Sequence, residues 1–266
     1  MHKKPSISLL ISTYNWPQAL ELVLLSVKRQ STLPNEVLIA DDGSTEQTKT
    51  LVAAFQKTFP IPIRHFWHED NGFRKASILN KAIAKSHSEY IIQVDGDCIL
   101  HKNFVKDHRI FATENNYLFG SRVTIKKEYL ATLFKIKKIN FNLFSTGIKK
   151  RTRTLHIPIL SKLYSKTNEL SKKFRGCNVS FWKEDIIAIN GYNEDFKGWG
   201  REDSEIIVRL INIGVLGRRL RYRGIVYHIF HNEKPKNRLE LNDTIQRNSM
   251  KNKSTWCTNG IDKHLA

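Results

Sequence analysis

Short apolar runs alternate with helix-like segments along the first 115 residues. The run 7–11 is apolar enough for a buried strand, and Leu20, Val23, Leu24 and Val27 repeat at helical spacing after Pro17, a residue type favoured at the start of a helix. The same pattern predicts strands at 36–40, 61–66 and 90–94 and helices at 45–57 and 74–86. Such alternation is typical of an α/β fold with a mostly parallel sheet, whose ligands bind beyond the carboxyl ends of the strands.

This rhythm is lost between residues 116 and 175, where the chain becomes basic. Leu130, Leu133, Phe134, Ile136 and Ile139 interleave there with lysines. We interpret 116–175 as an insertion or lid. Two alternatives stay open for its apolar stretch: an amphipathic helix lying on an anionic membrane surface, or a helix packed on the core.

Regular structure returns in the last third of the chain. The run 174–181 predicts a strand, and Ile206, Leu210 and Ile213 precede Gly214 at helical spacing, which predicts a helix over 203–213 with Asp203 at or near its N-terminus. Residues 232–266 are polar and are expected at the periphery. We therefore expect one domain in four parts: 1–115, the basic segment 116–175, a second site-bearing part 176–235 and a polar extension 236–266.

Positive charge is concentrated in the basic segment. The chain has 44 Lys and Arg against 25 Asp and Glu, a net charge of +19. Residues 121–175 contain fifteen of these cations and only Glu128 and Glu169 as acids, more than the mixed charge of an ordinary solvated face. An anionic partner is expected, and nucleic acid, acidic lipid and a phosphorylated small molecule all meet that description.

Length and cysteine usage limit the class of protein further. With 266 residues and 40% hydrophobic composition, the chain can bury a sizeable core. No apolar run approaches the roughly 18–20 residues that span a bilayer. The three cysteines are far apart and form no CxxC pair, which indicates neither a disulfide scaffold nor a thiolate zinc site. These features favour a globular protein of a reducing cytosol.

Two carboxylates follow the apolar run 90–94 in the sequence Asp95-Gly96-Asp97. Oxygen ligands at i and i+2 where a strand turns can hold Mg²⁺ or Mn²⁺ together with a diphosphate. Acids that merely cap a turn would look the same. Two other predicted strand ends are also polar, and a parallel sheet would bring all three together. They are Thr13-Tyr14-Asn15 and Asp41-Asp42-Gly43-Ser44.

A second cluster, Gly198-Trp199-Gly200-Arg201-Glu202-Asp203, lies at the start of the predicted helix 203–213. Helix capping explains one acid but not the Gly-Trp-Gly. Glycines let a ligand approach the backbone, an indole offers a stacking face to a sugar, and a carboxylate at the helix start can accept a hydroxyl proton. The cluster therefore favours a catalytic or sugar-binding role.

His228 and His231 follow the apolar run 224–227. An extended strand would point them to opposite faces, so both can reach one metal ion only if the chain turns. One ligand is expected and two remain open. Imidazole beside carboxylate would favour Mn²⁺ over Mg²⁺.

With these motifs in order, the sequence resembles the family 2 nucleotide-sugar glycosyltransferases of GT-A fold. The second half, with Ile189-Asn190-Gly191-Tyr192 and the Gly-Trp-Gly cluster, resembles the C-terminal module of β-1,4-galactosyltransferases and chondroitin-polymerase-like bacterial enzymes. The stretch 73–80 resembles their donor-binding helix, with lysine where arginine is more usual. Arg201 and Ser204 depart from the galactosyltransferase pattern, which leaves donor and acceptor choice open.

The resemblance implies a role for each site residue. The donor UDP-sugar would be bound within 1–115 and the acceptor within 176–235. Residues expected around the donor are Thr13, Tyr14, Asn15, Asp42 and Phe73 at the uridine, Lys75 near the diphosphate, Asp95 near ribose and sugar, and Gly176 and Asn178 around the sugar. The expected metal ligands are Asp95, Asp97, His228 and His231, with Mn²⁺ or Mg²⁺ as the ion. Asp203 would be the base, with Glu202 and Trp199 orienting the acceptor.

The resemblance further implies inverting transfer of a hexose or N-acetylhexosamine, galactose type favoured, in bacterial surface polysaccharide or lipopolysaccharide synthesis. The charge of 121–175 suggests a phosphorylated, lipid-linked acceptor at the inner face of the cytoplasmic membrane. A nucleic-acid- or lipid-binding protein on a disused transferase fold would explain the charge but not the acidic motifs, so no nucleic acid is expected. A sugar nucleotidyltransferase would carry a glycine-rich phosphate loop, and 12–16 has no glycine.

Overall fold

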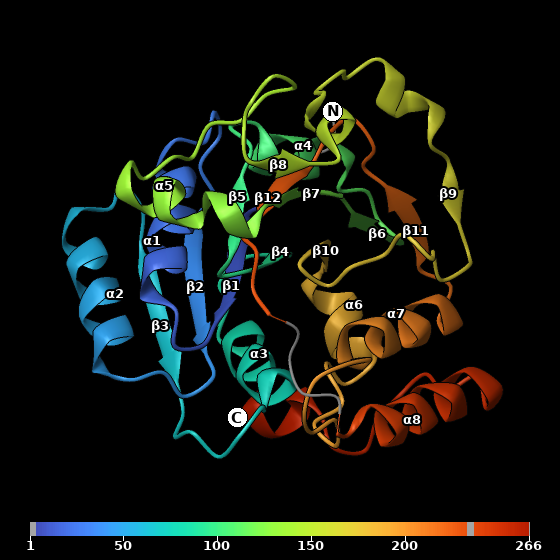
Figure 1. Ribbon diagram of the computed structural model, residues 1–266. Coiled ribbons are helices and arrows are strands. Elements are labelled where there is room, and N and C mark those ends of the chain that lie inside the picture. The colour runs from blue at the N-terminus through green and yellow to red at the C-terminus, as the bar shows by residue number, and fades with distance from the viewer. Residues whose placement is uncertain (1–3, 233–236, 266) are drawn as a thin grey trace.

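Two β-sheets form the centre of the computed structural model, which describes residues 4–232 and 237–265 (Figure 1). The larger sheet has the strand order β3-β2-β1-β4-β10-β6-β11-β9, and the smaller has the order β5-β12-β7-β8. The strands of the larger sheet are β1 (Ile7–Thr13), β2 (Glu36–Asp41), β3 (Ile63–Trp67), β4 (Tyr90–Asp95), β6 (Asn116–Phe119), β9 (Lys166–Thr167), β10 (Asn178–Trp182) and β11 (Leu216–Arg219). Those of the smaller sheet are β5 (Cys98–Leu100), β7 (Ser121–Ile125), β8 (Ile148–Lys149) and β12 (Ile225–His228).

The first half of the larger sheet follows the predicted alternation of strand and helix. Strands β3, β2, β1 and β4 pair in parallel. Helices α1 (Pro17–Lys28) and α2 (Glu46–Thr58) bury Val23 and Val52 in the cluster on one face, and α3 (Lys75–Ala84) buries Ile78 in the cluster on the other. Every residue of β1 and β2 is buried, as expected for strands covered on both faces. The predicted mostly parallel α/β sheet is confirmed.

The basic segment begins inside the two sheets rather than as a separate insertion. Strand β6 pairs with β10 and β11, and β7 pairs with β12, because the residues 117–119 and Val123 and Ile125 are apolar and buried. A further helix, α4 (Phe104–Phe111), precedes them. From 126 onward the segment consists of loops and short helices, including α5 (Leu130–Lys135), and rejoins the sheets only at the two-residue edge strands β8 and β9.

Helix α5 packs on the core, which decides between the two alternatives for its apolar residues. Leu133 is fully buried in a cluster with Ala19 and Leu22 of α1, and Leu130 and Phe134 pack against the same cluster. Among the large apolar side chains of this stretch, only Ile136 at the end of the helix is exposed. Of the two alternatives, the structure therefore shows the helix packed on the core. Among the described residues, no helix is long and apolar enough to cross a membrane.

The last part of the chain contains three helices. They are α6 (Lys183–Ala188), α7 (Glu202–Asn212) and α8 (Leu239–Lys251). The sequence places 236–266 at the periphery, yet Ile261 is fully buried in the core cluster that contains α3 and α7. Figure 1 shows α8 lying beside α7. The predicted start of this helix near Asp203 is confirmed, since α7 begins one residue earlier.

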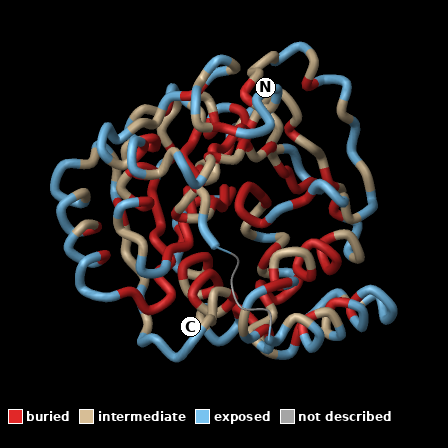
Figure 2. Tube along the Cα trace, viewed as in Figure 1, coloured by how far each residue is buried: buried red, intermediate tan, exposed pale blue. Residues whose placement is uncertain are grey.

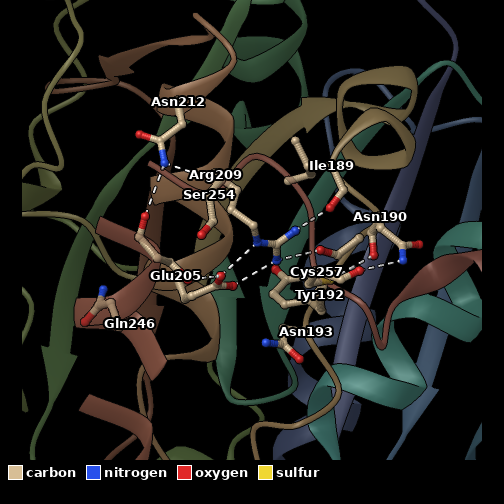
Figure 3. A network of polar contacts seen from close by, with 12 residues as sticks. Ile189, Asn190, Tyr192, Asn193, Glu205, Arg209, Asn212, Gln246, Ser254 and Cys257 are labelled. Carbon is tan, nitrogen blue, oxygen red and sulfur yellow. Dashed lines mark hydrogen bonds and ion pairs between the residues drawn. The ribbon is translucent and has the colours of Figure 1, made fainter. Parts of the chain in front are cut away.

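A buried arginine fixes α7 to its surroundings (Figure 3). Arg209 is fully buried and donates two hydrogen bonds, each 2.8 Å, to the two carboxylate oxygens of Glu205 one turn earlier. It also donates to the backbone oxygens of Ile189 and Gly191. Ser249 of α8 donates to Glu205 at 2.9 Å. This network ties the helix that begins with Glu202 and Asp203 to the loop 189–192 and to α8.

Replacing Arg209 by Met is expected to lower the free energy of unfolding by about 3–5 kcal/mol, because Glu205 would remain buried without a counter-charge. Urea denaturation of the purified protein measures this. The double variant Arg209→Met with Glu205→Leu should recover much of the loss, since an apolar pair leaves no unpaired charge. Equal stability of the wild type and Arg209→Met would contradict the argument.

Candidate functional site

A cavity of about 560 Å³ lies where β1 and β4 end and α7 begins. The polar strand ends and the N-terminus of α7 both open onto it. Its wall contains thirteen of the fifteen predicted site residues: Thr13, Tyr14, Asp42, Phe73, Lys75, Asp95, Asp97, Gly176, Trp199, Glu202, Asp203, His228 and His231. Ligand binding at the carboxyl ends of parallel strands is the usual arrangement of this sheet type.

Asn15 and Asn178 do not line the cavity, because the fold uses their side chains. The Asn15 side-chain oxygen accepts a hydrogen bond from the Thr45 amide at 2.9 Å and so shapes the turn into α2. Asn178 is buried, and its amide donates to the backbone oxygens of Gly224 at 2.7 Å and of Ser121 at 3.3 Å. Asn178 therefore joins the two sheets, and its expected contact with a sugar is replaced by this structural role.

Asp97, His228 and His231 converge on one point of the cavity. Nε2 of His228 lies 3.6 Å and Nε2 of His231 3.4 Å from Oδ2 of Asp97. The chain turns after β12, so both histidines reach the same carboxylate although they lie three residues apart. One ligand atom from each residue lies within 4.8 Å of the others. This spacing suits three ligands around one divalent ion.

The orientation of His231 and the burial of His228 also suit a metal. Nδ1 of His231 lies 2.7 Å from the backbone oxygen of Asn232, which can only accept, so Nδ1 donates there and Nε2 is the nitrogen available to a metal ion beside Asp97. Burial lowers the pKa of His228, against the opposing effect of Asp97, and favours the neutral imidazole that binds metals. The donor set fits a Mn²⁺-like ion better than Mg²⁺.

Asp95, expected both near the donor sugar and as a metal ligand, forms an ion pair with Lys75. Its carboxylate accepts hydrogen bonds from Nζ of Lys75 at 2.6 Å and from Ser12 at 2.8 Å, and it is not among the three converging ligands. Burial alone would lower the pKa of Lys75, but neighbouring carboxylates, Asp95 first, raise it well above its usual value. Three of the four expected metal ligands thus converge in this structure, and Asp95 holds the Lys75 ammonium in the cavity.

Glu202 and Asp203 present two carboxylates at the start of α7. The backbone amide of Gly176 donates to Oδ2 of Asp203 at 2.8 Å, and the structure describes no donor to the other oxygen of this carboxylate. A Cβ atom at residue 176 would lie 2.4 Å from Asp203, so only glycine allows this approach. Burial, followed by the charge of Asp203, raises the pKa of Glu202 to about 7. Oε2 of Glu202 is buried and has no hydrogen-bond partner among the described residues.

A smaller cavity of about 280 Å³ adjoins the first and shares Tyr14, Asp42, Phe73 and Trp199 with it. Asp42 is held by His68 Nε2 at 2.7 Å and by the Arg74 amide, which donates at 3.0 Å. A fixed carboxylate in a cavity that aromatic rings also line can accept a hydrogen bond from the N–H of a base while a ring packs on that base. This end of the site therefore suits a nucleobase.

Sequence reasoning missed other residues of the cavity wall, chiefly Arg122 on β7 and Arg175 in the loop before β10. Both belong to the basic segment, but a high density of positive charge does not tell which of its cations face the site. The register of β7 against β12 and the loop 168–177 decide that, and neither can be obtained from spacing.

The class of protein follows from comparison with known families. The sequence profile of glycosyl transferase family 2 matches residues 8–167, more than half of the chain, and a profile described as the N-terminal domain of galactosyltransferase matches 160–232. The chain belongs to glycosyl transferase family 2, as the motifs had indicated.

Similar proteins include two polysaccharide synthases. Chondroitin synthase of Escherichia coli is 26% identical over 240 residues, which are 84% of this chain and 34% of that protein. Hyaluronan synthase of Pasteurella multocida is 23% identical over 231 residues, 80% of this chain and 23% of that protein. The chain thus spans about a third or less of the length of these relatives.

Solved structures show the same fold. Staphylococcus aureus TarS 1–349 in complex with UDP aligns with a TM-score of 0.62 and 16% identity over 98% of this chain and 70% of that one. The mannosyltransferase PcManGT from Pyrobaculum calidifontis, in complex with GDP-Man and Mn²⁺, aligns with a TM-score of 0.56 and 19% identity over 93% of this chain and 62% of that one. The expected GT-A type fold is confirmed.

Proposed function

We propose that the protein transfers a hexose or N-acetylhexosamine from a UDP-sugar to a saccharide acceptor, with inversion and with a divalent metal ion. The observation that carries this proposal is that one cavity contains the converging group Asp97, His228 and His231 and the carboxylate pair Glu202 and Asp203. The first group suits a nucleoside diphosphate with its metal, and the second suits a hydroxyl acceptor.

The donor would lie along the shared wall of the two cavities. Asp42, Tyr14 and Phe73 would contact the uridine, and Lys75 would approach the diphosphate with its charge kept by Asp95. Asp97, His228 and His231 would hold the metal ion, with Mn²⁺ favoured over Mg²⁺ by the two imidazoles. A bound divalent ion supplies positive charge that stabilises the leaving diphosphate.

Asp203 is the proposed base. Its carboxylate accepts the proton of the acceptor hydroxyl, and the hydroxyl oxygen attacks the anomeric carbon from the face opposite the diphosphate. The bond from the anomeric carbon to the diphosphate oxygen breaks, and its electron pair leaves with UDP. Glu202, whose pKa is raised to about 7 by burial and by Asp203, would bind a sugar hydroxyl, and Trp199 would pack on the sugar ring. The configuration inverts in one step without a covalent intermediate.

Galactose or N-acetylgalactosamine is the favoured donor sugar, because the second profile match is to a galactosyltransferase domain. The likeness to chondroitin synthase and to a Campylobacter jejuni enzyme named as acting on a lipid-linked, undecaprenol-bound glycan supports a role in bacterial surface polysaccharide or lipopolysaccharide synthesis. The donor sugar and the biosynthetic role are thus proposed from similarity alone, whereas the reaction class is proposed from the residues of the cavity.

The test of the donor site is thermal stabilisation by UDP, GDP, CMP and UDP-sugars, each with Mn²⁺ or EDTA. A ligand at 100 times its dissociation constant adds about 2.7 kcal/mol to the free energy of unfolding. We expect stabilisation by UDP compounds that needs Mn²⁺, with UDP-galactose or UDP-N-acetylgalactosamine among the strongest. No response to any nucleotide would refute the proposed function.

We further propose that residues 142–165 of the basic segment contact the inner face of the cytoplasmic membrane. Phe144, Ile159 and Leu163 have 85%, 71% and 77% of their surface exposed, more than any other large hydrophobic residue of the described chain. Ile159 and Leu163 lie between β8 and β9, where half of the residues are exposed, and Phe144 lies in the loop before β8 (Figure 2). Lys149, Lys150, Arg151 and Lys162 belong to the same part of the chain. Exposed apolar side chains beside cations are typical of proteins that bind anionic bilayers.

The double variant Phe144→Ser with Leu163→Ser is expected to bind phosphatidylglycerol vesicles at least about tenfold more weakly than the wild type, because each side chain loses apolar burial in the bilayer. Co-sedimentation at low salt measures this. Leu241→Ser with Met250→Ser removes two exposed apolar side chains of α8 and is the matched control. Unchanged binding of the first variant would contradict membrane contact through this segment.

A further inference from the structure

Four cations form a group that extends outward from the wall of the cavity, which we call the cationic subsite: Arg122, Lys150, Arg153 and Arg175. Arg122 and Arg175 line the cavity itself. Lys150 and Arg153 follow β8 and lie outside its lining. The first two thus face the reacting groups, and the other two continue the positive charge toward the protein surface.

One hydrogen bond joins two of these cations across the segment, and electrostatic effects link Lys150 to all three others. Nη1 of Arg153 donates to the backbone oxygen of Arg122 at 2.9 Å, which joins the turn Arg151–Thr154 to β7. Burial lowers the pKa of Lys150, and the positive charges of the other three members of the subsite lower it further. Like charges held close together repel one another. This repulsion destabilises the folded protein less when an anion lies between the charges.

Within residues 4–232 and 237–265, no acid forms an ion pair with any of the four side chains of the cationic subsite. Guanidinium groups match phosphate oxygens with paired N–H donors, and a cluster of them is the usual way in which proteins bind phosphate. The missing counter-charge is therefore expected from a ligand.

The loop that carries Lys150 and Arg153 is held in place. His156 lies 2.9 Å from the buried carboxylate of Asp107, which also accepts from Arg223 at 2.8 Å. The amide of Ile157 donates to the backbone oxygen of Tyr222 at 3.2 Å. The hydrogen bonds of His156 and Arg223 to Asp107 therefore hold the loop after β8 against the body of the protein. They fix the position of Lys150 and Arg153 relative to the cavity.

The position of the subsite points to the acceptor rather than the donor. Arg175 is adjacent to Gly176, whose amide holds Asp203, the proposed base, and the base must lie at the acceptor hydroxyl. The donor diphosphate is already served by Lys75 and by the group around Asp97. Lys150 and Arg153 lie beyond the lining shared with the donor.

We propose that the cationic subsite binds a phosphate group of the acceptor, so that the natural acceptor is a phosphorylated saccharide. This inference rests on the transferase function proposed above. It gives the basic segment two separate tasks: the exposed apolar residues contact lipid, and the subsite selects an acceptor that bears phosphate close to its acceptor sugar.

The test measures binding by calorimetry to protein saturated with UDP and Mn²⁺, so that the donor site is filled. Two probes share the same sugar and the same decyl chain: N-acetylglucosamine linked to decanol through a diphosphate, and the neutral decyl glycoside. We expect the wild type to bind the diphosphate probe about tenfold more tightly than the neutral one. In Lys150→Gln with Arg153→Gln this preference should disappear, while the affinity for UDP with Mn²⁺ stays unchanged.

The control variant Lys49→Gln with Lys57→Gln removes the same charge from α2 and should behave as the wild type. A preserved preference in the Lys150 and Arg153 variant overturns the proposal. So does a variant that loses UDP affinity instead, which would assign the cations to the donor, or one that loses only binding to phosphatidylglycerol vesicles, which would assign them to lipid headgroups. Failure of the proposed function itself would appear separately, as absence of UDP binding in the wild type.

Discussion

Replacing Asp203 by Asn is expected to reduce the rate of sugar transfer by about 10²–10⁴, the usual contribution of a general base. The variant keeps the size of the side chain and its hydrogen bond from Gly176 but can no longer accept the hydroxyl proton. UDP affinity with Mn²⁺ should stay the same, because Asp203 does not belong to the converging group around Asp97. Initial rates with a UDP-sugar donor, together with calorimetric titration of UDP, measure both quantities.

Two further variants are compared with Asp203→Asn: Glu202→Gln tests the second carboxylate of the site, and Asp262→Asn is the control. Glu202→Gln should raise the KM for the acceptor more than it lowers kcat, because Glu202 is proposed to orient the sugar. Asp262 is exposed on the turn Ile261–His264, and its replacement by Asn should leave the activity unchanged. If Glu202→Gln loses transfer and Asp203→Asn retains it, the two carboxylates have exchanged roles and our assignment of the base is wrong.

The second large effect is expected from Asp97→Asn, which should abolish the Mn²⁺-dependent stabilisation of the protein by UDP. Asp97 is the residue that both histidines approach, at 3.4 and 3.6 Å, and an amide oxygen is a far weaker metal ligand than a carboxylate. The loss should equal the effect of EDTA on the wild type, about 2.7 kcal/mol at 100 times the dissociation constant. Thermal unfolding reports it without any assay of activity.

Asp95→Asn separates this prediction from a general effect of lost charge. Asp95 pairs with Lys75 instead of the histidines, so its variant should keep a Mn²⁺ requirement while binding UDP more weakly. A Mn²⁺-dependent response that persists in Asp97→Asn and vanishes in Asp95→Asn would show that the metal lies at Asp95. The three-residue ligand set would then be incorrect.

Much of the first half of the fold could be predicted from the sequence, because its strands are apolar runs and its helices have clear spacing. Strand β1 and helix α1 were found on this basis. The strands β6 and β7 were not, because each has only four or five residues and lies beside a dense run of cations, so charge obscured the alternation. The buried Ile261 was missed because a single apolar residue in a polar extension gives no periodicity.

The residues of the site divide in the same way, into those that local sequence predicts and those that depend on tertiary packing. Asp97 could be predicted because it follows a strand and the ends of parallel strands meet in space, and Asp203 because helical spacing placed it at the start of α7. The partner of Asp95 could not, since it depends on the rotamer of Lys75 twenty residues away. Asn178 was assigned to the sugar on resemblance alone, and only the packing of two sheets shows that its amide is already satisfied.

The contact between Gly176 and Asp203 has a consequence for engineering this enzyme. The proposed base is held by the main chain, with no side chain between them, so the surrounding walls can be changed while the carboxylate keeps its place. New acceptors can accordingly be sought by varying Trp199, Arg122 or Arg175. Residue 176 itself should be left out of any such library, since even a methyl group there would displace the carboxylate of the proposed base.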